Sequence, residues 1–571
     1  MFSACLTPAQ PQNQMQSYTG ADIIITLLER QGIKTIAGIP GGANLPIYDA
    51  LARNGRIRHV LARHEQGAGF IAQGMTRVSG EVQVCFATSG PGATNILTAI
   101  ADARLDSIPI VCITGQVPSS LIGTDAFQEV DTYGLSIPIT KHNFLVRNIA
   151  ELFTVIPEAF RIAASGRPGP VLIDIPKDVQ QARMEVHSWP DPGTPDKPTA
   201  PERTPLIEAA AMINASRRPI LYIGGGIIAS GASKALLEVC EKSSIPVTPT
   251  LMGLDAIPSD HPLNIGMLGM HAARYTNHAL HACDLLIAVG SRFDDRATGR
   301  VEAFCPTARI IHVDIDPSEI DKIKPSSIGI TGDARLVLEA WIPEIRKTDR
   351  SEWITEIDEL RKRYPLELPG ADDPMSSYGV IRHTAALLPD DAIITTDVGQ
   401  HQMKVAQAYP FSTPRTWLTS GGLGTMGFGF PTAIGAALQA PDRPVVCFSG
   451  DGSFLMNIQE LATLAEENLN VKVILLDNQS LGLVHQQQDL FYGSRFIAVN
   501  YPRKVDFAAI AKGFGVDALS LGEAEDPSEA LAGAIQRPGP CLIHVPIDVY
   551  DKVFPMVPPG GCNTDMLTHT N

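Results

Sequence analysis

Two turns that follow apolar strands have the residue types needed to hold a divalent metal and a diphosphate. The first is Gly450-Asp451-Gly452, after the apolar run Val445 to Phe448, and the second is Asp477-Asn478. Two glycines allow the backbone to approach an anion closely, and a helix that begins there offers unpaired N–H groups and a positive dipole end. Asp451 and the side-chain carbonyl of Asn478 are hard oxygen ligands, which Mg²⁺ takes beside phosphate oxygens.

The spacing of the two turns strengthens this interpretation. A bare Gly-Asp-Gly is more often an ordinary surface turn. Here residues 453–477 separate Gly452 from Asn478, which is enough for one helix and one strand. A βαβ unit needs about that length to bring two strand C-ends side by side, where α/β sheets bind ligands. The pair of turns therefore predicts a metal–diphosphate site.

Composition and charge exclude several classes of protein. The chain has 571 residues, 44% of them hydrophobic, which is enough for three or four domains with buried cores. Its net charge is −16 with no long basic run, so nucleic-acid binding is not expected. No apolar stretch approaches membrane-spanning length. Residues 1–16 lack the features of signal and transit peptides, which predicts a frayed terminus in a cytoplasmic protein. The nine scattered cysteines fit buried thiols rather than disulfides.

Short apolar strands alternate with helices along the chain, which predicts parallel sheets covered on both faces. The Pro-rich stretch 188–205 predicts a linker. We expect an α/β protein of three doubly wound parallel-sheet domains, at 17–187, 203–346 and 376–550, with a C-terminal tail at 551–571. The expected strands are Lys34–Ile39, Val82–Ala87, Pro109–Ile113, Val171–Ile175, Pro219–Ile223, Leu285–Val289, Arg309–Val313, Ala392–Thr396, Val445–Phe448, Val471–Leu476 and Cys541–Val545.

An internal repeat indicates that the first and third blocks are two copies of one sheet domain. The matching pairs of segments are 167–179 with 537–549, and 84–92 with 446–452. The copies differ at the ligand positions, where the first has Pro91 and Gly115 in place of Asp451 and Asn478. Only the third block should therefore bind the metal diphosphate, and the first is free to hold another part of the same ligand.

These motifs, in this order, resemble those of thiamine-diphosphate enzymes. Over essentially its whole length the chain is similar to the catalytic subunits of acetolactate (acetohydroxyacid) synthases. The duplicated sheets resemble their pyrimidine-binding and diphosphate-binding domains, with an FAD-binding, Rossmann-like domain between them. The resemblance rests on Gly38-Ile-Pro-Gly-Gly42, Arg63-His-Glu-Gln-Gly-Ala-Gly69, Ser89-Gly-Pro-Gly-Ala-Thr-Asn95, Asp125-Ala-Phe-Gln-Glu-Val-Asp131, Arg292-Phe-Asp-Asp-Arg296, Asp397-Val-Gly-Gln-His401 and Gly482-Leu-Val-His-Gln486.

The resemblance implicates Glu65 in activating thiamine diphosphate. The alternative is that Glu65 only stabilises its helix, because a negative charge in the first turn interacts favourably with the helix dipole. The matching Glu of the family hydrogen-bonds the aminopyrimidine and stabilises its imino tautomer, which removes the thiazolium C2 proton. Met426 matches the apolar wedge that folds the cofactor, or it fills the core. The remaining cofactor contacts implied are Pro91, Asn95, Gly399, Gln400, His401, Gly450, Asp451, Gly452, Ser453, Asn478 and Leu483. The implied ligands of Mg²⁺ are Asp451, Asn478 and the carbonyl of Ser480.

The resemblance also implies FAD in the central block, without a redox part in the main reaction. The glycine-rich strand end at 222–226 is not G-x-G-x-x-G and would be a weak signal alone. The implied FAD residues are Gly224, Gly225, Gly226, Thr250, Leu251, Met252, Leu268, Gly269, Met270, His271, Gly290, Arg292, Asp294, Arg296, Asp314 and Ile315.

A 2-keto acid needs a cation for its carboxylate and an apolar pocket for the transferred group. An arginine fork suits the carboxylate, although Arg296 could equally form a surface ion pair. Gln487 stands where many relatives have Trp, which predicts a weaker preference for 2-ketobutyrate over pyruvate. Lys404 replaces a usual Trp, and Asp477 a usual Asn. Family positions that line the substrate channel match Phe127, Gln128, Lys141, Met252, Arg296 and Gln487, and the implied catalytic residues are Glu65, Gln128, Lys141, Arg296 and Met426.

The resemblance implies that the chain decarboxylates pyruvate and joins the hydroxyethyl carbanion to pyruvate or 2-ketobutyrate. The products would be 2-acetolactate or 2-aceto-2-hydroxybutyrate, in branched-chain amino-acid biosynthesis. A homodimer or homotetramer and a small regulatory subunit are expected. The alternatives are a related enzyme, such as pyruvate oxidase or glyoxylate carboligase, and a non-catalytic flavin- or nucleotide-binding protein. Glu65 argues against the carboligase, and Glu65, Asp451 and Asn478 together argue against a non-catalytic protein.

Overall fold

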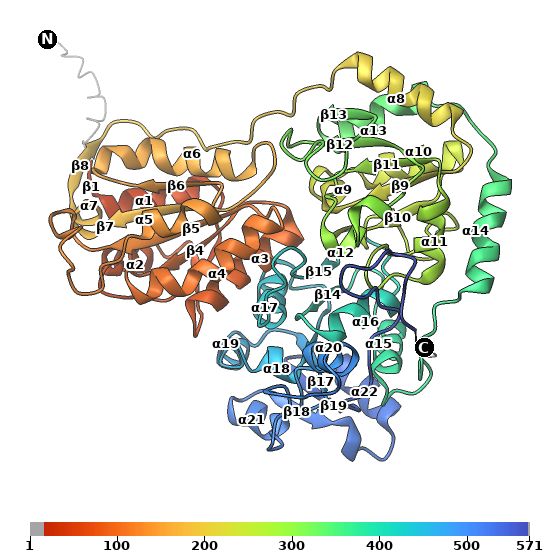
Figure 1. The fold of residues 1–571 in the computed structure, drawn as a ribbon. Helices are drawn as coiled ribbons and strands as arrows, with labels where there is room; N and C mark the ends of the chain where they lie inside the picture. The colour runs from red at the N-terminus through yellow and green to blue at the C-terminus, as the bar shows by residue number, and fades with distance from the viewer. Residues whose placement is uncertain (1–15, 569–571) are drawn as a thin grey trace, which may run out of the picture.

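Three parallel sheets, one per domain, organise the molecule (Figure 1). The structure is a computed structural model that describes residues 16–568, so the predicted frayed terminus lies almost wholly outside the described residues. The α/β fold class predicted from the sequence is confirmed, because every strand pair within these three sheets is parallel. An antiparallel ribbon of β1 (Gln16–Thr19) and β8 (Arg183–Val186), which the sequence did not predict, joins the two ends of the first domain.

The first sheet has six strands in the order β3-β2-β4-β5-β7-β6. The four predicted strands are confirmed, and the two that were missed, β3 and β6, form its edges, where short strands carry polar residues. Helices α1, α2 and α6 cover one face of the sheet, and α3 and α4 cover the other. The bounds are β2 (Thr35–Gly38), β3 (Arg58–Leu61), β4 (Gln83–Ala87), β5 (Ile110–Gln116), β6 (His142–Leu145), β7 (Val171–Pro176), α1 (Gly20–Arg30), α2 (Leu45–Asn54), α3 (Glu65–Ser79), α4 (Pro91–Leu105), α5 (Thr132–Ser136), α6 (Leu152–Ala164) and α7 (Lys177–Gln181).

The third sheet repeats this topology strand for strand, with the order β15-β14-β16-β17-β19-β18. The duplication inferred from the sequence is therefore confirmed at the level of topology. Helices α17, α19 and α21 cover one face, and α15, α16 and α22 cover the other. The bounds are β14 (Ile393–Thr396), β15 (Trp417–Leu418), β16 (Val445–Gly450), β17 (Val471–Asp477), β18 (Asp517–Ser520), β19 (Cys541–Pro546), α15 (Ser377–Ala386), α16 (Gln400–Ala408), α17 (Gly429–Gln439), α18 (Asp451–Phe454), α19 (Glu460–Glu467), α20 (Gly482–Phe491), α21 (Phe507–Gly513) and α22 (Pro527–Gln536).

The pairing of the strands corrects both ligand positions of the repeat. Gln116 and Asp477 end β5 and β17, and they pair with Pro176 and Pro546, which are equivalent positions of the repeated segments 167–179 and 537–549. The residue that matches Asn478 is therefore Val117, not Gly115. The same register places Ser89, not Pro91, opposite Asp451, so each match made from the sequence was displaced by two positions. A valine side chain has no oxygen to offer a metal, so the two copies still differ at this position.

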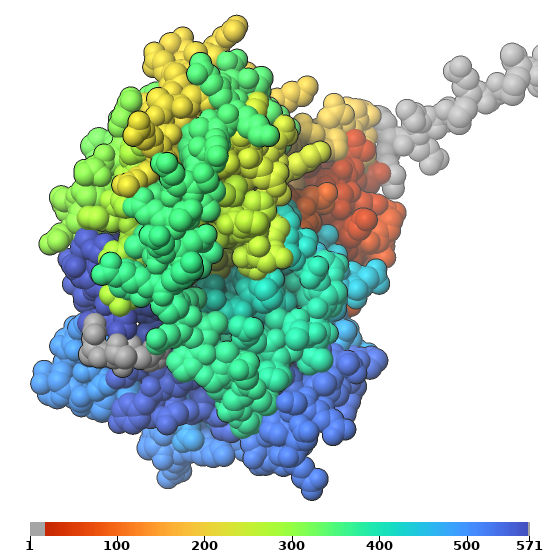
Figure 2. All heavy atoms as spheres, turned by 90° about the vertical axis from the view of Figure 1, so that its right-hand side faces the viewer, coloured from red at the N-terminus to blue at the C-terminus, as the bar shows by residue number. Residues whose placement is uncertain are grey.

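The middle sheet has the order β10-β9-β11-β12-β13. Helix α8 begins at Arg203, inside the stretch predicted as a linker, which is irregular only up to Glu202. Helix α14 is rich in charged residues, and it runs down the outer face of the middle domain toward the third (Figure 2). The bounds are β9 (Pro219–Ile223), β10 (Val247–Pro249), β11 (Leu285–Val289), β12 (Arg309–Asp314), β13 (Ile328–Thr331), α8 (Arg203–Ala215), α9 (Gly225–Ser230), α10 (Ser233–Ser243), α11 (Arg274–Ala282), α12 (Asp295–Thr298), α13 (Ala334–Glu344) and α14 (Ser351–Arg363).

The first and third domains share one hydrophobic core, in which α3 crosses α17. A Cβ on Gly74 would stand 2.2 Å from the carbonyl oxygen of Thr432, and one on Gly435 would stand 2.0 Å from that of Ile71. Glycine is therefore required where the helices cross. All eight cysteines of the described residues are buried and unpaired, as predicted. Within residues 16–568, no helix is long and apolar enough to cross a membrane.

Candidate functional site

Asp451 and Asn478 lie at the ends of adjacent strands, β16 and β17, which are hydrogen-bonded neighbours. The backbone N–H of Ser480 joins them, since it donates to Asp451 Oδ2 at 3.1 Å and to Asn478 Oδ1 at 3.1 Å. Asp451 is 3% exposed and Asn478 is 9% exposed. The sequence thus folds two hard oxygen ligands toward one small, buried volume, with Ser480 beside them.

The charge of this turn favours a cation. Burial, and then the nearby Asp477 carboxylate, raise the pKa of Asp451 to about 8. Burial alone would raise the pKa of Asp477 as well, but a hydrogen bond from His544 at 2.9 Å holds that pKa below its usual range. The described residues contain no group of three His, Cys, Asp or Glu side chains that could hold a metal alone. An ion such as Mg²⁺ would therefore need ligand oxygens, for example from a diphosphate.

The turn after β14 adds neutral polar groups to the same edge of the third sheet. Gln400 Oε1 accepts from Asn478 Nδ2 at 3.3 Å. Burial lowers the pKa of His401 to about 3, so its imidazole is neutral. The Nε2 of His401 is buried and has no hydrogen-bond partner among the described residues. The ring lies against Gly450, because a Cβ there would stand 2.8 Å from Nδ1. An unpaired buried nitrogen beside a glycine turn fits a site that receives a phosphate oxygen.

Glu65 begins helix α3, and a residue of α4 fixes its carboxylate. Asn95 Nδ2 donates to Glu65 Oε2 at 2.9 Å, and Glu65 is 8% exposed. Gly92 leaves room at the other oxygen, since a Cβ there would stand 3.2 Å from Oε1. The structure therefore brings two of the predicted cofactor residues together, close to Pro91 at the start of α4. The contacts of Glu65 described here are with its own domain, whereas those of Asp451 are with the third domain.

Met426 lies beside the diphosphate turn. Its Cε is 3.7 Å from the position that a Cβ on Gly452 would occupy. The residue belongs to the loop between β15 and α17, and its side chain is partly exposed. Ser453, at the second turn position after Asp451, donates its hydroxyl to the carbonyl oxygen of Val398 at 2.7 Å, next to the predicted Gly399. The predicted diphosphate residues of the third domain thus form one cluster with the predicted wedge.

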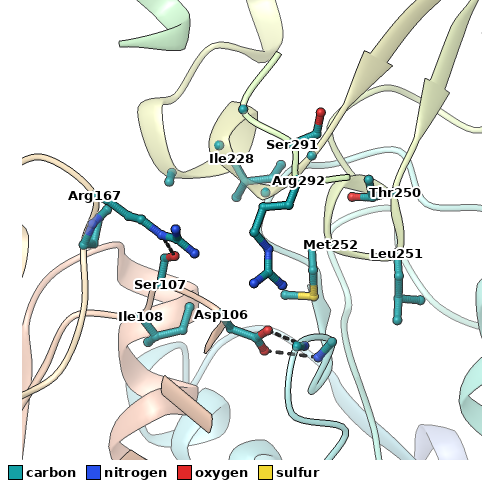
Figure 3. Close-up of a pocket in the computed structure, with 18 of the residues that line it drawn as sticks. Asp106, Ser107, Ile108, Arg167, Ile228, Thr250, Leu251, Met252, Ser291 and Arg292 are labelled. Carbon is teal, nitrogen blue, oxygen red and sulfur yellow. Dashed lines mark hydrogen bonds between the residues drawn. The ribbon is translucent and has the colours of Figure 1, made fainter. Parts of the chain in front are cut away.

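A cavity of about 1460 Å³ opens where the three domains meet, and Figure 3 shows part of its wall. All of the predicted FAD residues line it except Gly269, whose N–H donates to Asn277 Oδ1 behind the wall. Glycines shape its floor, because a Cβ on Gly224 would stand 2.4 Å from the carbonyl oxygen of Gly290. The size of the cavity, its glycine turns and the side chains of Arg292 and Arg296 fit a large anionic dinucleotide.

Sequence reasoning missed the wall that the first domain contributes to this cavity. Arg167 Nε donates to Ser107 Oγ at 2.9 Å, as Figure 3 shows, and its guanidinium also pairs with Glu319 of the middle domain at 2.8 Å. Arg167 was interpreted only as the start of the repeat. Its counterpart in the repeat, Arg537, is exposed and pairs with Asp517. The two arginines therefore have different surroundings, although the Arg-Pro-Gly-Pro sequence that each begins is the same.

The predicted substrate residues fall into two groups. Met252, Arg296 and Gln487 line the cavity, together with Leu483. The other three, Phe127, Gln128 and Lys141, belong to the first domain and do not line the cavity.

These three residues sit on or near loops of the first domain. Phe127 is 88% exposed, and the backbone of Gln128 has a φ of 60° and touches Gly90. Lys141 Nζ donates to the carbonyl oxygen of Ser165. Burial, followed by nearby arginines, lowers the pKa of Lys141 to about 8. Within one chain, the first-domain group and the cavity group remain apart.

Comparison with known proteins gives one consistent result. Three family descriptions match in order: "Thiamine pyrophosphate enzyme, N-terminal TPP binding domain" at residues 18–135, its "central domain" at 206–341 and its "C-terminal TPP binding domain" at 397–545. The chain is 59% identical to the acetolactate synthase isozyme 1 large subunit of Escherichia coli (strain K12), covering 96% of this chain and 98% of the relative. It is 46% identical to the acetolactate synthase large subunit of Parasynechococcus marenigrum (strain WH8102), covering 97% of this chain and 92% of the relative. It is 44% identical to the chloroplastic acetolactate synthase of Arabidopsis thaliana, covering 99% of this chain and 86% of the relative.

Proposed function

Because the chain belongs to the thiamine pyrophosphate enzymes, in the family of acetolactate synthase large subunits, we infer that it is a thiamine-diphosphate-dependent acetolactate synthase. It decarboxylates pyruvate and transfers the two-carbon unit to a second 2-keto acid, pyruvate or 2-ketobutyrate. The products, 2-acetolactate and 2-aceto-2-hydroxybutyrate, are precursors of the branched-chain amino acids. The observation that carries this inference is the division of labour between two copies of one sheet: Asp451 and Asn478 in the third domain, and Glu65 held by Asn95 in the first.

The third domain holds the diphosphate end of the cofactor. Asp451, Asn478 and the carbonyl of Ser480 would hold Mg²⁺, because they are hard oxygen ligands of the kind that this ion takes beside phosphate oxygens. His401 donates from its otherwise unpaired Nε2 to a phosphate oxygen, which is supported by its burial and neutrality. The rest of the set that surrounds the diphosphate is Gly399, Gln400, Gly450, Gly452 and Ser453.

The first domain acts on the other end of the cofactor. Thiamine diphosphate supplies the carbanion chemistry when it is bound. Glu65 holds a proton at the aminopyrimidine ring, and the amide of Asn95 keeps its carboxylate oriented through the 2.9 Å hydrogen bond. Met426 would supply the apolar surface against which the bound cofactor is held in a folded shape. Its proximity to Gly452 supports this role.

The cavity between the domains holds FAD and admits the substrate. Arg292 and Arg296 face the anionic parts of these ligands, and the glycine turns at Gly224 and Gly290 allow close approach. Arg296 is well placed to bind the keto-acid carboxylate, because its side chain is 67% exposed and its ion pair with Asp295 is long, at 3.8 Å. Met252 supplies apolar surface beside it.

The active enzyme is a homodimer or a larger assembly of such dimers, in which the first domain of one subunit meets the third domain of its partner. Exposed apolar side chains on both domains support this. On the first domain, Phe127 is 88% exposed and Ile137 is 58% exposed. On the third domain, Ile497 is 76% exposed and Met456 is 50% exposed. In such a dimer Phe127, Gln128 and Lys141 would reach the partner's cavity. The relatives are called large subunits, so a small regulatory subunit is also part of the proposal, as is a cytoplasmic location.

An acetolactate assay tests this function. Purified protein is incubated with pyruvate, with thiamine diphosphate, Mg²⁺ and FAD each omitted in turn, for the wild type and for Glu65→Gln. We expect acetolactate to form only with thiamine diphosphate and Mg²⁺, and Glu65→Gln to lose most of the activity. Equal activity of the two proteins would refute the role of Glu65. Oxygen or quinone reduction in place of acetolactate would indicate an oxidase instead.

A further inference from the structure

The loop that carries Met426 depends on groups outside its own domain. This loop, residues 419–427, here called the wedge loop, joins β15 to α17 and has no regular secondary structure. It contains four glycines, so its conformational freedom is large unless contacts restrict it. Its far end is fixed within the third domain, where the N–H of Gly427 donates to Asp397 Oδ1 at 2.7 Å. The middle of the loop has to be held from elsewhere.

Asp102 of α4 and Asp106, the residue that follows the helix, hold the middle of the wedge loop. Asp102 Oδ2 accepts from Ser420 Oγ at 2.5 Å and from Thr425 Oγ1 at 2.8 Å, while the N–H of Thr425 donates to Ser420 Oγ at 2.8 Å. One turn later, Asp106 accepts from the N–H groups of Gly421 at 3.1 Å and Gly422 at 2.7 Å, which are the two dashed lines that end at Asp106 in Figure 3. A single carboxylate oxygen of Asp102 therefore ties the two ends of the glycine-rich stretch together.

The burial of this network is hard to explain as packing alone. Asp102 is fully buried, and Arg77 beneath it is 8% exposed. Arg77 donates to Asp106 Oδ2 at 2.8 Å and to the carbonyl oxygen of Thr419 at 3.0 Å. Burial, and then Asp106, raise the pKa of Asp102 to about 6, while Arg77 opposes them. Buried charges rarely add stability over well-packed apolar residues, so a carboxylate kept here has a specific geometric task.

We propose that Asp102 is a positioning residue of the reaction, which fixes the wedge loop and so holds Met426 against the cofactor. This rests on the proposed function, which assigns the folding of thiamine diphosphate to Met426. In the proposed dimer, helix α4 of one chain then serves two active sites, one through Glu65 and the other through Met426. Asn95, which orients Glu65, and Asp102 are seven residues apart, about two helical turns, and therefore lie on the same face. One rigid element thus sets the position of Glu65 for one site and, through the wedge loop, that of Met426 for the other.

The substitution Asp102→Asn removes this geometry with little change of shape. The amide has one acceptor oxygen and one donor nitrogen. If the oxygen faces the hydroxyls of Ser420 and Thr425, the nitrogen faces Arg77, and two donors then oppose each other. If the amide is reversed, the nitrogen faces the hydroxyls, and the O–H groups of Ser420 and Thr425 lose the oxygen that accepts from them. Neither orientation satisfies all of the partners, so the loop is released.

Two measurements test the proposal. Backbone amide exchange of the wedge loop is followed in cofactor-free protein, and the exchange rate of the C2 proton of bound thiamine diphosphate is measured by quenched-flow NMR. For Asp102→Asn we expect faster amide exchange in the loop. We also expect the exchange of the C2 proton to slow by about tenfold or more, which is the effect of losing a charged hydrogen bond. The affinity for the cofactor should change by less than about threefold, because the diphosphate site is intact. Thr425→Val, which removes one of the hydroxyls, should change both rates in the same direction by less, and it replaces Asp102→Asn if that variant does not fold.

A matched control separates positioning from general destabilisation. Asp284 is another acid that accepts from a serine hydroxyl, that of Ser216, and from two backbone N–H groups, at the opposite end of β11 from the cavity. Asp284→Asn should lower stability and leave both exchange rates as in wild type. Unchanged loop exchange in Asp102→Asn, or a C2-proton rate within twofold of wild type, would overturn the proposal. If wild-type protein does not accelerate C2-proton exchange at all, the proposed function fails, and the positioning role fails with it.

Discussion

Gly435 is predicted to be the position where the junction of the first and third domains tolerates least change. A Cβ at this residue would stand 2.0 Å from the carbonyl oxygen of Ile71, whereas real Cβ atoms essentially never come closer than 3.0 Å. Gly435→Ala therefore forces α17 and α3 apart by about 1 Å, in a core shared by two domains. Overpacking of this kind costs about 1–3 kcal/mol. For domains of about 150–250 residues, this loss of stability corresponds to a fall of about 2–12 °C in the midpoint of thermal unfolding.

Alanine also favours a helix over glycine by about 1 kcal/mol, which partly hides the clash. Gly533→Ala supplies the baseline, because Gly533 lies in α22 with nothing within 4 Å of its virtual Cβ. Thermal unfolding of both variants is followed by fluorescence, and the difference between them isolates the crossing of α3 and α17. We expect Gly533→Ala to unfold at or above the wild-type midpoint and Gly435→Ala below it. Equal midpoints for the two variants would refute the close contact, and with it the claim that the domains share one core.

Two further predictions concern the substrate. Gln487 lies at the cavity wall. When pyruvate and 2-ketobutyrate compete, Gln487→Trp should shift the product ratio toward 2-aceto-2-hydroxybutyrate by on the order of tenfold, which is the effect of changing one contact in a substrate pocket. An unchanged product ratio would contradict this. Burial lowers the pKa of Lys141 to about 8, so its ammonium, which is present below this pH, is lost above it. The KM for pyruvate should therefore rise above pH 8 in wild type but not in Lys141→Arg, and parallel profiles would exclude Lys141 from substrate binding.

The parts of the site that follow from local spacing were predictable from the sequence. The turn at Gly450-Asp451-Gly452 and the amide of Asn478 lie one βαβ unit apart, and such a unit has few ways to place two strand ends. The same holds for Glu65 and Asn95, which begin neighbouring helices of one domain. Strands were missed where they are short or carry polar residues, as at both edges of the first sheet.

Contacts between domains were not predictable, because sequence patterns carry no information on which surfaces meet. Arg167 and the Asp102 network face other domains, and their residue types are ordinary for helix and strand ends. Lys404 shows the same limit. The sequence marks it as a departure from relatives, but only the structure shows its partners. Its buried Nζ pairs with Asp551 at 2.7 Å and donates to Ser377 Oγ at 2.8 Å, which fastens the start of the C-terminal segment.

We propose that the catalytic acid and the metal ligands of one active site come from different subunits. Two inactive variants, Glu65→Gln and Asp451→Ala, are mixed under conditions that exchange subunits, and acetolactate formation is measured. In a mixed dimer, one site receives both mutations and the other receives neither. Random exchange of equal amounts makes half of the dimers mixed, so about one quarter of wild-type activity should return. If both residues served a site within one chain, every site would carry a mutation, and the mixture would stay as inactive as its components.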